Sequence, residues 1–167
     1  MNFFKKQSGR WFSQRTTHYL KAGDSKAGKS DLEIVYIDTN ADDVVRICDQ
    51  VGWFTKDAIG GLRIVQKSTI LGGQTRSQST LLVAIATDDS SGKLVSQPND
   101  SDSTQISQYR FENDVLTIVT EANDLRSEER WWFITERLRM RTNVLSDANG
   151  QTMASFCSEI KLGEVKT

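Results

Sequence analysis

Arginine side chains alternate with apolar ones in the stretch from residue 137 to residue 144. A β-strand directs successive side chains to opposite faces. One face would carry Leu138, Met140 and Val144, and the other Arg137, Arg139, Arg141 and Asn143. Guanidinium groups bind carboxylates and phosphates bidentately, so this row could bind an anionic ligand. A solvated outer surface would show the same spacing, and spacing alone favours that plainer interpretation.

Further polar side chains suggest what such a ligand could be. Glu129 lies just before Trp131 and Trp132, and the last predicted strand carries Ser155, Cys157 and Glu159 on one face. Arginines would pair acid tails, a carboxylate would accept from ring N–H groups or hold a proton, and indole rings would cover a flat face. Such a cavity suits a flat, conjugated acid. Adjacent strand residues point to opposite faces, so core packing accounts for at least one tryptophan.

The sequence gives little support for a metal site or for a catalytic nucleophile. His18 is the only histidine, and Cys48 and Cys157 lie far apart in no metal-ligand spacing. This pattern argues strongly against a zinc site and a histidine-dependent triad. Cys157 has no expected histidine partner, which disfavours a catalytic thiol. Both cysteines are expected to be reduced and buried, as in a cytosolic protein.

The chain of 167 residues is long enough for one domain, which we place at 1–167. Its 21 basic and 22 acidic side chains give a formal net charge of −1, which argues against a general nucleic-acid binder. The N-terminus lacks the apolar run of a secretory signal, and no segment reaches membrane-spanning length. We therefore expect a soluble, intracellular protein without membrane insertion.

Short β-branched and aromatic segments dominate the pattern. Strands are predicted at 9–20, 31–38, 62–71, 75–86, 105–111, 114–121, 127–134, 138–145 and 151–162, with at most a short one in 93–104. Residues 21–30 are predicted to form a loop, Gly72-Gly73 and Glu112-Asn113 to form turns, and residues 2–7 could make a short helix. One convincing helix begins at Asn40 or Asp42 and ends at Gly52.

About ten short strands with a single helix predict an all-β protein, either a sandwich or a closed antiparallel barrel. Closure removes exposed edges and leaves room for one small ligand, so a ligand-holding barrel is the preferred prediction. The segment 9–20 is polar on both faces, so it either forms an edge or lines a ligand-filled space.

Specific strings resemble the S/U-type phycobiliprotein lyases over nearly the whole chain. They are Arg10-Trp-Phe-Ser-Gln-Arg-Thr-Thr-His18, Asp43-Val-Val-Arg-Ile-Cys48, Ser127-Glu-Glu-Arg-Trp-Trp-Phe133, Leu138-Arg-Met-Arg-Thr142 and Met153-Ala-Ser-Phe-Cys-Ser-Glu159. The resemblance implies a lipocalin-like barrel of ten strands with a helix. It also implies non-covalent binding of a linear tetrapyrrole (a bilin) and its delivery to a cysteine of an apo-phycobiliprotein as a thioether.

The family's pocket residues carry over by motif. Glu129 and Glu159 become the candidate catalytic residues, and Arg139 or Arg141 becomes a ligand contact. The N-terminal motif adds three ligand-binding candidates, Arg15, Thr17 and His18, to Trp131 and Ser155. This chain departs from the family at Tyr19, where a second histidine is frequent, and at 66–72, where Trp-Glu-Gly-Thr-Met-Glu-Trp is frequent. These departures leave the pocket's shape and the preferred bilin open.

Three hypotheses follow. The first is a lyase whose partners are a bilin, phycoerythrobilin or phycocyanobilin, and an apo-phycobiliprotein subunit, working without a metal in a cyanobacterial cytosol or plastid stroma. The second is a carrier that delivers the same ligand without catalysis. The third is a lipocalin-like binder of another small apolar acid. A symmetric homodimer is common among soluble proteins and stays open here.

Overall fold

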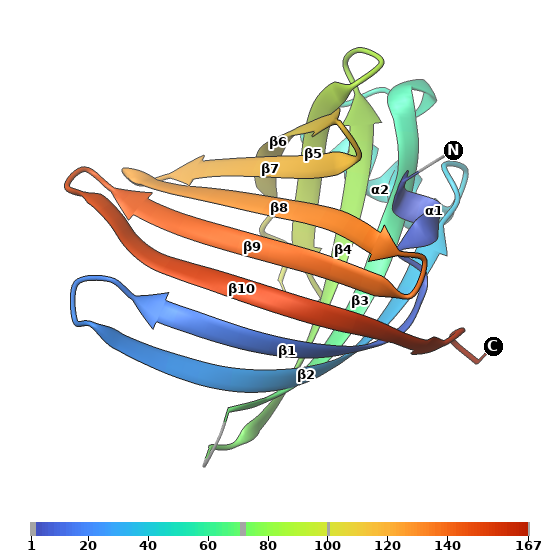
Figure 1. The fold of residues 1–167 in the computed structure, drawn as a ribbon. Helices are drawn as coiled ribbons and strands as arrows, with labels where there is room; N and C mark the ends of the chain where they lie inside the picture. Colours follow the sequence, from blue (N-terminus) through green and yellow to red (C-terminus); the bar gives the residue numbers. More distant parts are fainter. Residues whose placement is uncertain (1–2, 71–72, 100, 167) are drawn as a thin grey trace.

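The computed structural model describes residues 3–70, 73–99 and 101–166 as a closed antiparallel barrel. Each strand pairs with the next along the chain, and β1 closes the barrel by pairing with β10 (Figure 1). The strands are β1 Gly9–Tyr19, β2 Asp24–Ile37, β3 Ala58–Ile70, β4 Thr75–Ala86, β5 Ser91–Pro98, β6 Gln105–Glu112, β7 Val115–Ala122, β8 Leu125–Thr135, β9 Leu138–Asp147 and β10 Gly150–Gly163. The prediction of a barrel of about ten strands is confirmed.

Aromatic side chains fill one end of the barrel around the short helix α1 (Phe3–Lys6), which confirms the helix predicted at 2–7. The Phe3 ring lies 5.0 Å from Phe111 and 5.7 Å from Phe133, measured between centroids. Trp11, which is fully buried, packs against Phe133 from β1. In Figure 1 the hairpins β1–β2, β7–β8 and β9–β10 turn at the other end, away from α1. We call the two ends the closed end and the mouth.

Helix α2 (Asp42–Val51) covers the outside of the wall formed by β3 to β5. Its buried residues Val44, Ile47 and Cys48 pack against Leu81, Val83, Ile85 and Val95. This part of the barrel wall is therefore buried on both faces. The helix ends at Gly52 as predicted, in the left-handed conformation (φ 74°) that glycine adopts without a steric penalty.

The helix begins at Asp42, one of the two predicted starts, and its N-cap residue Ala41 makes no side-chain hydrogen bond. Asp42 and Asp43 lie inside the first turn, where their charge favours the positive end of the helix dipole. A 3-10 turn (Thr55–Asp57) follows the helix before β3. No helix among the described residues is long and apolar enough to cross a membrane.

The loop predicted at 21–30 is also wrong, because β2 already begins at Asp24. The polar and glycine-rich composition suggested a loop, but β1 pairs with this segment along its whole length, from Tyr19–Asp24 to Gly9–Ile34. In a closed barrel the backbone donors and acceptors of both strands need partners, and pairing overrides composition.

The turn predicted at Glu112-Asn113 lies one residue later, at Asn113-Asp114, where both φ angles are positive (52° and 62°). Asparagine and aspartate tolerate this conformation, so the turn residues fit the hairpin. The turn predicted at Gly72-Gly73 falls partly outside the described residues.

Gly92 in β5 offers a test of the packing at the closed end. An added Cβ would overlap the Ile85 carbonyl oxygen and lie 2.7 Å from the Tyr109 ring, whereas one at Gly28 in β2 would meet only Thr69 O at 3.6 Å. We expect Gly92→Ala to lower the free energy of unfolding by roughly 1–3 kcal/mol and Gly28→Ala to change it by less than about 1 kcal/mol. Urea unfolding measures both. Equal effects of the two substitutions would contradict this packing.

Candidate ligand-binding site

The polar faces of β9 and β10 point into the barrel. Register pairs Arg139 with Glu159 and Arg141 with Cys157, so the four side chains lie together on the inner face. Their apolar neighbours Leu138, Met140, Phe156 and Ile160 occupy the outer face by the two-residue period. The inner wall here is thus charged, the reverse of an ordinary strand over an apolar core.

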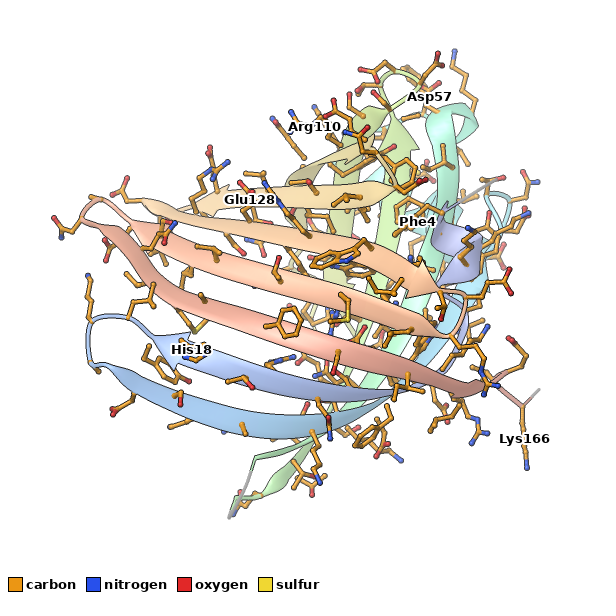
Figure 2. The ribbon with its side chains drawn as sticks, viewed as in Figure 1. Phe4, His18, Asp57, Arg110, Glu128 and Lys166 are labelled. Atoms are coloured by element: carbon orange, nitrogen blue, oxygen red, sulfur yellow. The ribbon has the colours of Figure 1, made fainter. Side chains whose placement is uncertain are left out.

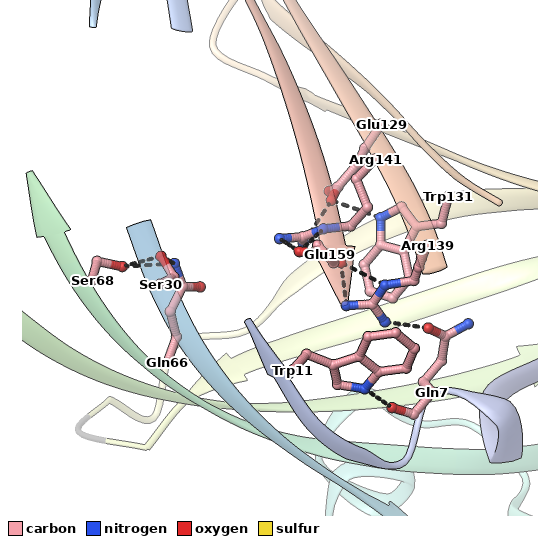
Figure 3. A network of polar contacts seen from close by, with 10 residues as sticks. All are labelled: Gln7, Trp11, Ser30, Gln66, Ser68, Glu129, Trp131, Arg139, Arg141 and Glu159. Carbon is pink, nitrogen blue, oxygen red and sulfur yellow. Dashed lines mark hydrogen bonds and ion pairs between the residues drawn. The ribbon is translucent and has the colours of Figure 1, made fainter. Parts of the chain in front are cut away.

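A fully buried ion-pair network lies toward the closed end (Figure 3). Arg139 and Glu159 have no exposed surface, and Arg139 Nε donates to Glu159 Oε2. The Arg139 guanidinium lies 4.6 Å from the Trp11 ring and 5.3 Å from the Trp131 ring, within cation–π range of both. The Arg139 guanidinium also donates to the side-chain oxygen of Gln7. The backbone oxygen of Gln7 accepts a hydrogen bond from Trp11 Nε1 at 2.9 Å. The network therefore connects β9 and β10 to the residue that follows α1.

Arg141 continues this network toward the mouth. Its Nη2 lies 2.7 Å from Glu159 Oε1, and its Nη1 lies 3.4 Å from Glu129 Oε1. Glu129 also accepts from Trp131 Nε1 at 2.7 Å. The side chains of Arg141 and Glu129 stay 15% and 28% exposed, unlike those of Arg139 and Glu159. Arg141 and Glu129 are therefore the members of this chain of ion pairs that a ligand in the barrel can reach.

Two cavities meet at Glu129. One, of about 350 Å³, carries the cationic groups and is lined by Arg15, Thr17, Tyr19, Glu129, Arg141, Thr142, Asn143, Met153, Ser155 and Cys157. The other, of about 430 Å³, is more apolar and is lined by Leu82, Leu94, Ser96, Gln105, Ser107, Ile118, Thr120, Ala122, Asn123, Leu125, Ser127, Glu129, Trp131 and Leu145. We call them the cationic cavity and the apolar cavity. Together they offer an apolar surface beside fixed cations, which is the lining an amphiphilic organic acid requires.

A second polar cluster faces the network from the opposite wall (Figure 3). Gln66 Nε2 donates to Ser30 Oγ at 3.2 Å and to Ser68 Oγ at 2.8 Å, and the two hydroxyls lie 2.9 Å apart. Ser30 comes from β2, and Gln66 and Ser68 come from β3. This wall of the barrel therefore offers hydrogen-bonding groups.

In this network, the attraction between opposite charges offsets the effect of burial on the pKa values. Burial alone would raise the pKa of the Glu159 carboxyl, but Arg141 and Arg139 outweigh burial and hold that pKa below its ordinary value. Burial lowers the pKa of Arg139 to about 10 despite the opposing effect of Glu159. For Arg141, burial is outweighed by Glu159 and Glu129, which raise its pKa. All three groups are therefore charged at neutral pH.

The geometry separates the predicted site residues into three groups. Arg15, Thr17, Glu129, Arg141 and Ser155 line the cationic cavity, and Trp131 lines the apolar cavity beside Glu129. Arg139 and Glu159 lie behind them in the buried network.

His18 forms the third group alone, because it lies in neither cavity lining nor the buried network. It is exposed, and the alternation along β1 places it on the outer face, opposite Thr17. Figure 2 shows His18 on β1 near the mouth, far from Phe4 at the closed end. The prediction that His18 binds an interior ligand is therefore wrong in geometry, because neighbouring strand residues cannot share a face.

Sequence reasoning missed Gln7 and the cluster of Ser30, Gln66 and Ser68. Gln7 is fully buried, yet it follows a four-residue helix with no periodicity to mark it. Ser30 was placed in a predicted loop, so its inward orientation was not visible. The period of β3, with Gln66 and Ser68 two residues apart, is the one pattern that could have indicated a polar inner face.

The buried network generates a stability prediction. Glu159→Gln would leave Arg139 buried without its counter-charge, so we expect the free energy of unfolding at neutral pH to fall by about 3–5 kcal/mol. Glu128→Gln is the matched control, because Glu128 also pairs with two arginines, Arg126 and Arg130, but on the outer face. There we expect a loss of about 0–1 kcal/mol. Equal losses from the two substitutions would refute this role for Glu159.

The contribution of Glu159 to the free energy of unfolding depends on pH. Because the folded-state pKa of Glu159 is lowered, its contribution is complete above the unfolded-state value of about 4.3 and is lost as the pH falls through the folded-state pKa. Wild-type protein should therefore lose more unfolding free energy across this acidic window than Glu159→Gln does.

Comparison with known proteins shows the family of this chain. A family model described as CpeS-like protein matches residues 1–162. The chromophore lyase CpcS/CpeS of Thermosynechococcus vestitus is 36% identical over 167 residues, covering 97% of this chain and 92% of the relative. Chromophore lyase CpcS/CpeS 1 of Trichodesmium erythraeum is 33% identical over 168 residues, covering 96% of each.

A solved structure shares the fold. The S-type phycobiliprotein lyase CPES from Guillardia theta superposes with a TM-score of 0.83 at 24% identity, covering 99% of this chain and 92% of that one. The family match spans nearly the whole chain, and the relatives cover it from end to end. By its sequence and its ten-stranded barrel, this chain belongs to the CpeS-like family.

Proposed function

We propose that this protein is a bilin lyase: it binds a linear tetrapyrrole without a covalent bond and delivers it to a cysteine of an apo-phycobiliprotein subunit. The observation that carries the proposal is the pairing of Arg141 with Glu129 where the cationic and apolar cavities meet. The names of the relatives, chromophore lyases at 36% and 33% identity, support it from outside the structure.

The two cavities match the two sides of a bilin. Its propionates would pair with Arg15 and Arg141 in the cationic cavity, through charge-assisted hydrogen bonds. Its conjugated rings would lie in the apolar cavity against side chains such as Leu94, Ile118 and Trp131. Pyrrole N–H groups would then face Glu129, which lines both cavities. A simple fatty acid carries a single carboxylate and could not pair both Arg15 and Arg141 with separate acid tails, so it fits less well.

The reaction is an addition that needs no leaving group. The acceptor thiolate attacks the exocyclic ethylidene carbon of the bilin, a C–S bond forms as the C=C π bond opens, and a proton is taken up by the ring system. Glu129 is the candidate to hold or transfer that proton, because it faces the cavities. Glu159 is saturated by two guanidinium groups and acts instead by positioning Arg141.

The nucleophile in this scheme belongs to the partner. Cys48 lies on the buried face of α2, and Cys157 is buried in the cavity wall next to Arg141 in register. The lyase would supply binding, orientation and proton transfer, as suits a cytosolic or stromal assembly step. The polar cluster of Ser30, Gln66 and Ser68 on the far wall would help decide which bilin is accepted.

Ligand binding is tested by an absorption titration with phycoerythrobilin and with phycocyanobilin. We expect wild-type protein to give a red-shifted, sharpened band and Arg141→Gln to bind roughly 10- to 100-fold more weakly, the loss of a charged hydrogen bond. Arg130→Gln is the matched control, because Arg130 lies one strand away on the outer face, and it should bind as wild type does. Thermal unfolding checks that both variants fold. A wild-type titration without a spectral shift would overturn the proposal.

Catalysis is tested separately from binding with Glu129→Gln. We expect this variant to bind bilin but to form the thioether about a hundredfold more slowly, because it can no longer exchange a proton. The measurement is covalent pigment on the apo-subunit after denaturation, and Glu128→Gln, the neighbour on the outer face, is the control. Attachment at the wild-type rate by Glu129→Gln would instead favour a carrier that only delivers the ligand.

A further inference from the structure

The barrel wall has a side opening at the mouth, between β6 and β7. The backbone pairing of these two strands ends at Gln108–Val119, although both strands continue toward the mouth. Residues 105–107 of β6 pair only with β5, and residues 120–122 of β7 pair only with β8. Figure 1 shows the β7–β8 hairpin continuing to the mouth while β5 and β6 turn away behind it. We call the space between the two segments the side notch.

The edge of β6 presents backbone groups to the side notch. The two-residue turn at 113–114 places hydrogen-bonded pairs at every second position of the ladder between β6 and β7. Gln108 and Val119 form the last of these pairs, and Ile106 with Glu121 would form the next, but the two strands have already separated there. The N–H and C=O groups of Ile106 therefore face the side notch.

This edge lacks the features that normally keep an open strand edge from pairing with another chain. Such edges carry charged side chains, prolines or bulges. Residues 105–107 are Gln, Ile and Ser, and the Ile106 side chain is 48% exposed. The facing edge of β7 carries Glu121, which forms an ion pair with Arg126. The edge of β6 is therefore the side on which a further strand can add.

The side notch opens into the apolar cavity. Ser107 on one edge and Thr120 on the other line that cavity, and their hydroxyl oxygens lie 2.6 Å apart at the inner end of the notch. Gln105 and Ala122 line the same cavity further toward the mouth. A side chain that points inward from a segment in the notch therefore enters the apolar cavity.

We propose that an extended segment of the acceptor, the one that carries its cysteine, adds to the edge of β6 in the side notch. This inference rests on the proposed function, because it assigns the docking of the acceptor that the lyase needs. Backbone groups along a strand edge bind a polypeptide backbone, which distinguishes this surface from the pigment-binding interior.

The alternation of an added strand would place the thiol where it is needed. The residue opposite Ile106 would point outward, and its two neighbours would point inward into the apolar cavity. The cysteine would be one of these inward neighbours, beside the conjugated rings that are proposed to lie there. The exposed Ile106 side chain would contact the outward residue.

The first test removes the N–H of Ile106. Ile106→Pro deletes this donor, and proline is tolerated where the N–H does not serve the protein's own sheet. Ile106→Thr is the matched control, because threonine keeps the N–H and suits a strand. We expect Ile106→Pro to raise the apo-subunit concentration for half-maximal attachment about tenfold and Ile106→Thr to raise it less than about threefold. Thermal unfolding and the bilin titration check that both variants keep the barrel and bind the pigment.

Amide hydrogen exchange gives a second measurement that needs no variant. The Ile106 amide should exchange rapidly in the free protein, and a saturating apo-subunit should slow this exchange at least about tenfold. Amides of the β4–β5 turn at 87–90, outside the notch, should exchange at an unchanged rate.

The outcomes separate this inference from the proposed function. Attachment by Ile106→Pro at the wild-type half-maximal concentration, or an Ile106 amide that the apo-subunit leaves unchanged, overturns the docking and leaves the lyase standing. Equal tenfold losses in Ile106→Pro and Ile106→Thr would assign the effect to the side chain and overturn strand addition. A wild-type protein that neither binds bilin nor attaches it overturns both proposals.

Discussion

The carboxylate of Glu159 is buried without exposed surface between two guanidinium groups, and much of the barrel's organisation depends on it. An isolated buried charge costs several kcal/mol, so this carboxylate needs both arginines, and each buried arginine needs the carboxylate. Through Arg139 the network reaches Gln7 and the residues that close one end. Through Arg141 it reaches Glu129 and Trp131 at the cavities. One ion therefore links the closed end of the barrel to the two cavities in its interior.

Because side chains alternate between the two faces of a strand, the inward orientation of Glu159 also decides which side chains lie on the outer surface. With Glu159 and Cys157 inside, Phe156, Ser158 and Ile160 must lie outside. The same holds on β9, where the arginines point inward and Leu138 and Met140 outward. A charged interior and an apolar exterior are thus two results of one register. Exchanging the faces would bury the apolar side chains but would expose the charged side chains that line the cavities.

Much of this fold could be predicted, because hydrophobic period and turn residues are local. The ten-stranded barrel, the helix ending at Gly52 and the break near Glu136 all follow from such patterns. The start of β2 could not be predicted this way, because residues 24–30 become a strand only through pairing with β1. The composition of a segment is a property of that segment alone, whereas strand pairing depends on a second segment that lies elsewhere in the chain.

The candidate site shows the same division. The two-residue period of a strand predicts that Arg139 and Arg141 share one face. It does not predict how far along the barrel each side chain lies, and this position separates the buried Arg139 from the cavity-lining Arg141. His18 was carried over from a motif, although its neighbour Thr17 already occupies the inner face. Gln7 acquires its role only where α1, β1 and β9 meet, which no local pattern records.

The filled end of the barrel has a kinetic consequence for a protein that passes a ligand on. Aromatic rings and the Arg139 network occupy one end, so a ligand would enter and leave through the other, where the linings of both cavities reach the hairpin turns. For the lyase proposed above, the acceptor would dock at that same opening to receive the bilin. The two partners would then bind in compulsory order, ligand first, because an acceptor that arrives early would block the empty barrel. Excess acceptor would thus act as a substrate inhibitor of its own modification.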